Sequence, residues 1–122
     1  MLEGFYEQTQ PLTQYEEEIL LPVMVKCLKR HKGEKRVITN KQMCEALEEN
    51  GYKAGAARIR KVINHIRING LVEFLVANSK GYFVATSKDE VKSHISSLIG
   101  REQAINAVRR ALEKQMSGFP DN

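Results

Sequence analysis

Residues 53–70, KAGAARIRKVINHIRING, contain the side chains best suited to binding a charged partner. At 100° per residue the apolar residues of this stretch gather on one side, which predicts an amphipathic helix. The other side presents Arg58, Arg60, Lys61, Asn64 and His65, with Arg67 at its margin, and no acidic residue. A solvated helix face usually mixes signs to form i,i+4 pairs. The pattern therefore predicts a face that meets something negative, and a DNA duplex fits best.

The chemistry of such a face is base and phosphate recognition. An α-helix fits the major groove of B-DNA, where Arg bridges guanine O6 and N7 and Asn bridges adenine N6 and N7. From their place along the helix we expect Arg58 and Lys61 at base edges, and Arg60 and Arg67 on phosphates. The opposing interpretation is a solvated basic face that binds no ligand.

A second basic cluster occupies residues 29–36, KRHKGEKR. Residues 21–36 and 53–70 each carry a charge of +5, whereas residues 1–20 carry −5 and the whole chain +4. Such segregation of charge favours nonspecific binding to the phosphates of a nucleic acid. The expected contacts are Lys29, Arg30, Lys32, Lys35 and Arg36, with Lys53 before the helix and Lys80 at a predicted hairpin tip. A basic loop is also often only a soluble loop.

Other kinds of site find little support. The histidines His31, His65 and His94 lack a spacing for metal binding or acid–base catalysis, and Cys27 and Cys44 sit on apolar helix sides as small hydrophobes. No serine has the sequence context of a nucleophile elbow or a partner base, and no glycine-rich phosphate-binding loop is present. We expect no enzyme, no metal and no cofactor. No signal peptide or membrane span is evident, so a cytoplasmic protein is expected.

The elements before the basic helix are predicted from local signals. Thr13 and Glu16 have capping-box spacing, and they open a helix that Pro22 should kink or delay. Glu16, Glu17 and Glu18 form an acidic start that favours the helix dipole. The buried stripe of this helix is predicted to be Ile19, Leu20, Val23, Met24, Cys27 and Leu28.

A short strand and a second helix are predicted next. Residues 36–39 are β-branched enough for a small strand, and Thr39 and Gln42 then cap a helix over 40–49 that Asn50 and Gly51 end. After the basic helix, residues 71–77 and 82–86 read as two strands joined by the four residues NSKG. At least one of Tyr82 and Phe83 should be core.

This order predicts an α+β, mainly α fold: a winged helix–turn–helix over residues 13–87, with three helices, a small strand and a β-hairpin wing. A long helix follows over 88–116, opened by Ser87 and Glu90. Residues 1–12 and 117–122 read as flexible tails.

The long helix carries an apolar stripe that recurs every seven residues: Val91, Leu98, Ile105 and Leu112. Ile95 and Met116 support the stripe, while Glu102 and Arg109 interrupt it. We expect residues 91–99 to pack on the domain. The dimerisation surface would then be formed by Ile105, Val108, Leu112 and Met116. The alternative is that the whole helix folds back on the first one.

Several segments resemble a family of small, mostly uncharacterised winged-helix proteins of bacteriophages and mobile elements. They are LTQYEEEILLPVMVKCLK, ITNKQMCEAL, ARIRKVINHIRINGLVEFLVANSKGYFVA and SLIGREQAI, over roughly residues 12–116. The resemblance implies a winged-helix fold and DNA binding, but no operator and no catalytic residue.

Two functions follow as hypotheses. The first is a double-stranded DNA-binding protein, a transcription regulator or replication accessory, that acts as a homodimer. The alternative is a winged-helix module that binds another protein without reading DNA sequence. Single-stranded nucleic acid fits less well, because the basic helix has no aromatic side chain for stacking.

Overall fold

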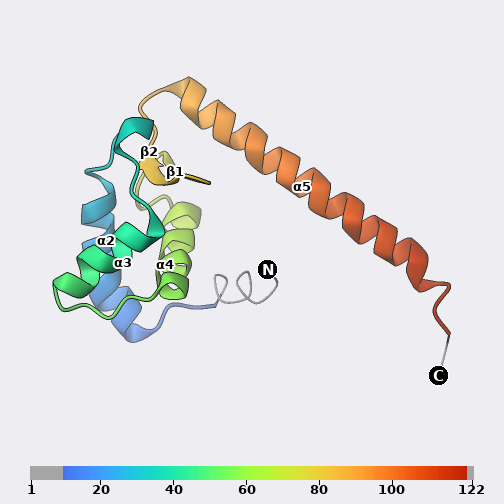
Figure 1. The fold of residues 1–122 in the computed structure, drawn as a ribbon, viewed down its shortest axis with the longest axis horizontal. Helices are drawn as coiled ribbons and strands as arrows, with labels where there is room; N and C mark the ends of the chain where they lie inside the picture. The colour runs from blue at the N-terminus through green and yellow to red at the C-terminus, as the bar shows by residue number, and fades with distance from the viewer. Residues whose placement is uncertain (1–9, 121–122) are drawn as a thin grey trace. The chain divides into compact units, whose positions relative to one another are not determined.

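The computed structural model describes residues 10–120 and divides the chain into two compact units, one ending at Ser87 and one beginning at Lys88. The fold is mainly helical, with a two-stranded antiparallel sheet in the first unit and one long helix in the second (Figure 1). The tails predicted at 1–12 and 117–122 fall partly outside the described residues, since residues 1–9 and 121–122 are not described.

The first helix begins irregularly, as Pro22 requires. Thr13 and Glu16 exchange both capping-box hydrogen bonds, at 2.8 and 3.2 Å. A π-helical turn, η1 (Glu16–Leu20), follows, and the Leu21 N–H donates to the Glu16 carbonyl five residues back. The regular helix α2 (Leu21–Leu28) then has Pro22 in its first turn, where the missing N–H is tolerated. The predicted delay of the regular helix is confirmed.

The π-turn also changes which residues of this helix are buried. Leu20, Met24 and Leu28 are fully buried as predicted, but Ile19 is 44% exposed. The prediction for Ile19 is wrong because the wider turn rotates side chains relative to a 3.6-residue helix. Glu16 lies four residues before Leu20 and takes an inward position instead, at 3% exposure.

Helices α3 (Asn40–Glu49) and α4 (Ala56–Asn69) match their predicted positions. Both bonds of the Thr39 and Gln42 capping box are present. Gly70 ends α4 in the left-handed conformation, at φ 64°, as expected of a helix C-terminus. Helix α4 packs against both α3 and α2, which gives the basic helix a rigid support.

The hairpin is shorter than its sequence suggests. Strand β1 (Leu75–Asn78) pairs with β2 (Gly81–Val84), and Asn78 opposes Gly81, so the turn contains only Ser79 and Lys80. The residues from 71 to 74 form a turn instead of extending β1, and Phe74 ends it at φ 61°.

The strand predicted at residues 36–39 is reduced to a single bridge. A 3₁₀ turn, η2 (Glu34–Arg36), includes the first of these four residues, and within residues 36–39 only Ile38 pairs with the sheet. Ile38 and Tyr82 exchange two backbone hydrogen bonds, at 2.9 and 2.8 Å. The prediction of a longer strand is wrong because residues 34–36 close a local turn before the chain reaches β2.

The core of the first unit combines both secondary-structure types. Its fully buried members come from η1, α2, α3 and α4: Leu20, Met24, Leu28, Met43, Ile59, Val62 and Ile66. The hairpin adds Leu75 and Tyr82 to this cluster, and α2 contacts β2. Tyr82 and Phe83 are both buried, which confirms that at least one is core.

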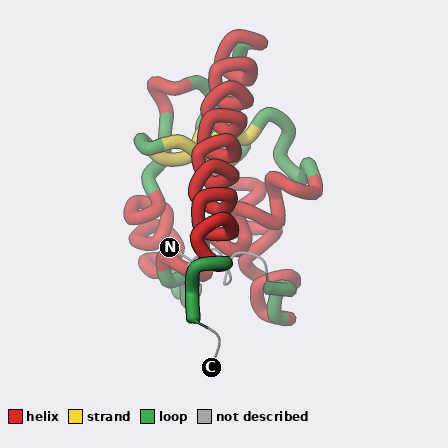
Figure 2. The backbone as a smooth tube through the Cα atoms, turned by 90° about the vertical axis from the view of Figure 1, so that its right-hand side faces the viewer, coloured by secondary structure: helices red, strands yellow, loops and turns green. Residues whose placement is uncertain are grey.

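Helix α5 (Lys88–Met116) makes up most of the second unit and is continuous through Gly100 (Figure 2). None of its residues is buried. The exposed apolar side chains along it are Ile95, Leu98, Ile99, Ile105, Val108, Leu112 and Met116. A single stripe of apolar side chains on a solvated helix is typical of an element made to pair with another surface.

Candidate nucleic-acid interface

The basic face of α4 meets an acidic side chain from outside the helix. Glu16 accepts a hydrogen bond from Arg58 Nε at 2.9 Å and one from Lys61 Nζ at 2.7 Å. The side chains of Glu16, Lys61 and Arg58 are 4%, 13% and 36% exposed. The face is free of acids only along its own helix, so the surface expected to meet DNA is partly neutralised by η1.

The ionisation of Glu16 fits this arrangement. Burial raises the pKa of its carboxyl, but hydrogen bonds from Lys61, the Thr13 backbone N–H and Arg58 outweigh burial and leave the pKa below its usual value. Glu16 is therefore a carboxylate held between two cations. Glu16 thus binds Arg58 and Lys61 in addition to lying at the helix start, while Glu17 and Glu18 remain exposed there.

Tyr15 extends the cluster to the connection between α3 and α4. Its hydroxyl accepts a hydrogen bond from the Lys53 N–H at 2.8 Å and donates one to the Lys53 carbonyl at 3.0 Å. The Arg58 guanidinium also lies 5.2 Å from the centre of the Tyr15 ring, a cation–π distance. Lys53 itself is exposed. These contacts give Arg58 and Lys61 a structural role that the sequence did not indicate.

The polar face of α4 consequently has two flanks. At 100° per residue, Arg60 and Arg67 lie about 20° apart and Asn64 lies about 40° from Arg60. Arg58, Lys61 and His65 lie on the flank toward Glu16, where the Asn69 side chain donates to the His65 carbonyl. We call the residues Arg60, Asn64 and Arg67 the outer flank.

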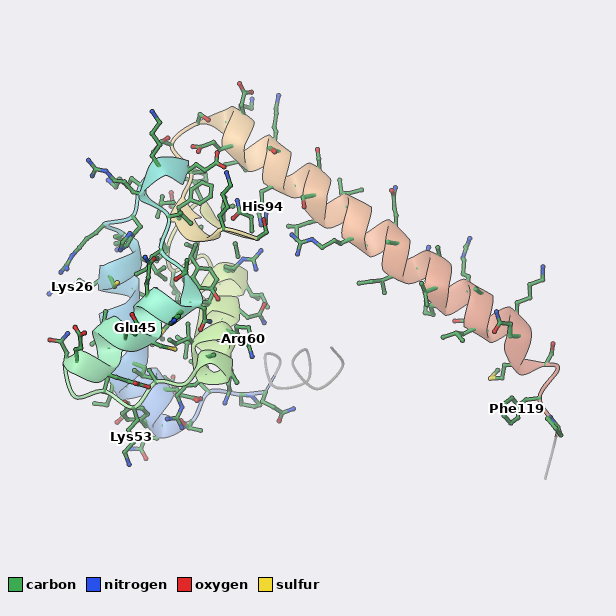
Figure 3. All side chains as sticks on the ribbon, in the orientation of Figure 1. Lys26, Glu45, Lys53, Arg60, His94 and Phe119 are labelled. Atoms are coloured by element: carbon green, nitrogen blue, oxygen red, sulfur yellow. The ribbon has the colours of Figure 1, made fainter. Side chains whose placement is uncertain are left out.

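The outer flank lies beside α3. Arg60 is exposed on α4. Burial raises the pKa of the Cys44 thiol, and against this larger effect the positive charge of Arg60 lies close enough to α3 to lower it. Figure 3 shows Arg60 on α4 and Glu45 on the neighbouring α3. Asn64 and Arg67 are half-buried, and each interacts with another residue. Of the basic side chains on α4, Arg60 is the most exposed.

Asn40 joins the elements around this flank. It is the first residue of α3, and its side-chain amide donates to the carbonyl of Ala56, the first residue of α4, at 3.3 Å. The same amide donates to the Tyr82 hydroxyl of β2 at 3.1 Å. The starts of α3 and α4 are thus fixed to each other and to the hairpin.

The loop of residues 29–36, here called the basic loop, is attached to β2 by its backbone. The Val84 N–H donates to the His31 carbonyl at 2.7 Å, and the Gly33 N–H donates to the Val84 carbonyl at 2.8 Å. His31 Nδ1 closes the loop by donating to the Arg36 carbonyl at 2.8 Å. The five cations predicted to bind phosphate all remain exposed: Lys29, Arg30, Lys32, Lys35 and Arg36.

The hairpin turn has its own link to the basic loop. Lys80 Nζ forms an ion pair with Glu34 at 2.9 Å, and both side chains are more than half exposed. Such a surface pair contributes little to stability and is readily exchanged for another partner. Lys80, predicted to touch DNA, therefore starts from a contact inside the protein.

A shallow hollow of about 490 Å³ lies between the basic loop and the start of α3. Its lining residues are Arg30, His31, Arg36, Val37, Ile38 and Gln42. Two guanidinium groups, an imidazole and an amide around an open hollow can hold an oxyanion such as a phosphate diester.

Within residues 10–120, no group of three or more His, Cys, Asp or Glu side chains is placed to hold a metal ion. In the same part of the chain, no helix has the length and apolar character needed to cross a membrane. Cys27 and Cys44 are half-buried free thiols. Burial raises the pKa of both, which disfavours the reactive thiolate.

Comparisons of the chain with protein-family models, curated proteins and solved structures found no match. The assignment of a function therefore depends on the geometry of the outer flank and the basic loop.

Proposed function

We propose that this chain is a double-stranded DNA-binding protein built as a winged helix–turn–helix. In this proposal α3 and α4 are the helix–turn–helix, β1 and β2 are the wing, and α4 enters the major groove. Where such a fold has a small third strand, this chain has the isolated bridge between Ile38 and Tyr82. The resemblance to phage and mobile-element winged-helix proteins suggests a transcription regulator or a replication accessory.

The observation that carries the proposal is Arg60, exposed on the outer flank of α4 next to α3, with the basic loop held on β2 by backbone hydrogen bonds. A helix–turn–helix protein places base-reading side chains on its second helix and phosphate contacts on flanking segments. Arg60 and Asn64 have the chemistry to read guanine and adenine edges. Arg67, Lys53, Lys80 and the five cations of the basic loop suit phosphates, and two of those five, Arg30 and Arg36, line the hollow.

This proposal reassigns Arg58 and Lys61. The sequence suggested them as base contacts, but Glu16 holds both within hydrogen-bonding distance. Moving either one to a base edge would leave the Glu16 carboxylate under-compensated at 3% exposure, which is costly. Arg60, expected on phosphate, becomes the best candidate for a base edge.

Selection from a randomised duplex pool at two salt concentrations tests the proposal. We expect an enriched motif and a steep fall in affinity with salt, because several phosphate contacts release counterions. Salt-sensitive binding without enrichment would leave only nonspecific DNA binding. An absence of binding at low salt would contradict the proposal.

Two variants then separate base reading from phosphate binding. Arg60→Ala should weaken binding to the selected duplex by roughly 10- to 100-fold and relax preference at one base position. Lys32→Ala should weaken all duplexes alike and reduce the salt slope by about one ion. Lys26→Ala is the matched control, since Lys26 is an exposed cation on α2 (Figure 3). Equal effects of all three variants would argue against a reading helix.

Protein recognition is the second candidate function, favoured by apolar exposure beside the wing. Ile68, Leu71 and Phe74 are 74%, 41% and 61% exposed, at the end of α4 and in the turn before β1. Exposed apolar groups of this kind mark partner surfaces. Replacing Phe74 by Ser would distinguish the two functions: it should leave DNA binding unchanged, whereas a protein-binding module would lose its partner.

A further inference from the structure

The apolar stripe of α5 has a charge pattern that selects one kind of partner. Its two core positions per seven residues are Val91, Leu98, Ile105 and Leu112 in one row, and Ile95, Glu102, Arg109 and Met116 in the other. The stripe runs 25 residue steps, about 38 Å, and is sustained for nearly four heptads. The residues on the outer side of the helix are small or polar, including Ser96, Gly100 and Ala107. The helix therefore has one face to cover.

A parallel pair of α5 helices would bring like charges together. In that arrangement each core residue faces its own copy. Glu102 would face Glu102 and Arg109 would face Arg109 in two consecutive layers of the second row, both in a desolvated seam. Like charges that face each other in a desolvated seam, without an opposite charge nearby, disfavour the parallel helix pair.

An antiparallel pair brings opposite charges together. With a two-fold axis midway between Glu102 and Ile105, Val91 faces Met116 of the second copy and Ile95 faces Leu112, so the two ends of the stripe coincide. Glu102 and Arg109 then face Ile105 and Leu98. Glu102 lies about four residues, or 6 Å, along the axis from Arg109 of the second copy and on the same side of the seam, within reach of a guanidinium.

The positions flanking the seam support the same orientation. Lys92 and Glu113 occupy the flanking position next to the second core row, and in the antiparallel pair they meet across the two helices, once at each end. In the single chain Arg109 pairs with Glu113 one turn away, and both side chains are more than half exposed. Such a pair is weak, so Arg109 can exchange Glu113 for Glu102 of the second copy.

We infer that α5 pairs with the α5 of a second copy of this chain as an antiparallel, two-fold symmetric coiled coil. Its seam is centred between Glu102 and Ile105 and is closed by Lys92–Glu113 ion pairs. This inference is independent of the proposed DNA binding. It assigns the dimerisation residues Ile105, Val108, Leu112 and Met116 to the same contact as Val91 and Ile95.

Charge exchange in the full-length protein, followed by sedimentation equilibrium, tests both the pairing and its direction. Lys92→Glu alone, or Glu113→Lys alone, should weaken the homodimer by about tenfold, because each puts like charges at both ends of the seam. An equimolar mixture of the two variants should regain wild-type affinity as a heterodimer, since both ends then pair opposite charges. Lys114→Glu, on the outer side of the helix, is the matched control and should change nothing.

Far-UV circular dichroism would verify that each variant stays helical. A protein that remains monomeric up to about 100 µM, as expected if α5 covered its own first unit, would overturn the inference. A dimer whose affinity is not restored in the mixture would also overturn it, because residues 92 and 113 do not meet in a parallel pair. If the wild-type protein formed the dimer but bound no duplex, only the proposed function would be contradicted.

Discussion

At the scale of single residues, Glu16 is the feature with the clearest energetic consequence. It is the one buried charged side chain among the described residues, and Arg58 and Lys61 hold it on α4. Ion pairs of this kind cost desolvation and do not always stabilise a fold, but removing one member leaves the others uncompensated. Glu16 therefore controls how firmly the start of the first helix is attached to α4.

Glu16→Gln should lower the free energy of unfolding by about 1–3 kcal/mol near pH 7. The exposed neighbour Glu17 offers the matched control, Glu17→Gln, which should stay within about 0.5 kcal/mol of wild type. Urea denaturation followed by circular dichroism measures both. If the two variants had equal free energies of unfolding, the ion pairs of Glu16 with Arg58 and Lys61 would not stabilise the fold.

The same residue predicts a pH dependence. The folded pKa of Glu16 is lower than its usual value, so the unfolded state binds more protons as the pH falls and stability decreases with it. The contribution is present above the unfolded pKa of about 4.3 and is lost as the pH falls through the folded value. The stability difference between wild type and Glu16→Gln should therefore shrink below about pH 4. A difference independent of pH would contradict this assignment.

At the scale of the elements, the contact between the hairpin and residue 38 determines how the hairpin is held. A Cβ atom at Gly81 would lie 2.4 Å from the Ile38 carbonyl oxygen, and Gly81 adopts φ 134°. Both the close approach and the backbone conformation require glycine. The sheet therefore depends on a backbone-to-backbone contact that no side chain at position 81 can replace.

Gly81→Ala should destabilise the protein by about 2–4 kcal/mol through steric clash and backbone strain. Gly100 provides a contrasting substitution in the interior of α5, where an added Cβ meets no atom within 4 Å. Gly100→Ala should raise helix stability by about 0.5–1 kcal/mol. Thermal unfolding of the two variants should show shifts of opposite sign, and a tolerated alanine at Gly81 would contradict the close approach.

At the scale of the whole molecule, the buried hydrophobic residues all lie between Leu20 and Ala85 in the described chain. The first unit therefore contains its own core, while α5 contributes an exposed stripe. This division predicts that folding and self-association are carried by different parts of the chain.

A truncation after Ser87 should retain a single cooperative unfolding transition and lose self-association. Its affinity for the selected duplex should fall at least tenfold. In the dimer, binding of one DNA-binding unit raises the effective concentration of the second unit at the same duplex, and the truncated monomer lacks this gain. Calorimetry and duplex titration measure the two effects. A truncated chain that does not unfold cooperatively would contradict the independence of the first core.

The sequence predicted the elements whose signals are local. The Thr39 and Gln42 capping box and the Gly70 stop placed α3 and α4 correctly, since caps and left-handed glycines act within one turn of a helix. Periodicity likewise identified the buried side of α4. The length of the strands was less predictable, because it depends on which backbone groups find a partner strand and not on β propensity alone. Pairing with β2 determines where β1 begins, and it limits Ile38 to a single bridge.

The candidate site was predictable as a set of residues but not as a surface. From the sequence alone the cations of α4 formed one basic face, and the order of charged residues along the chain determined that this helix and residues 29–36 would be the positive parts of the protein. Only the tertiary structure brought Glu16 to Arg58 and Lys61, 42 and 45 positions away, and left Arg60 on the outer flank. The physical reason is that an ion pair between distant segments depends on how helices pack, whereas charge and periodicity are properties of each segment by itself.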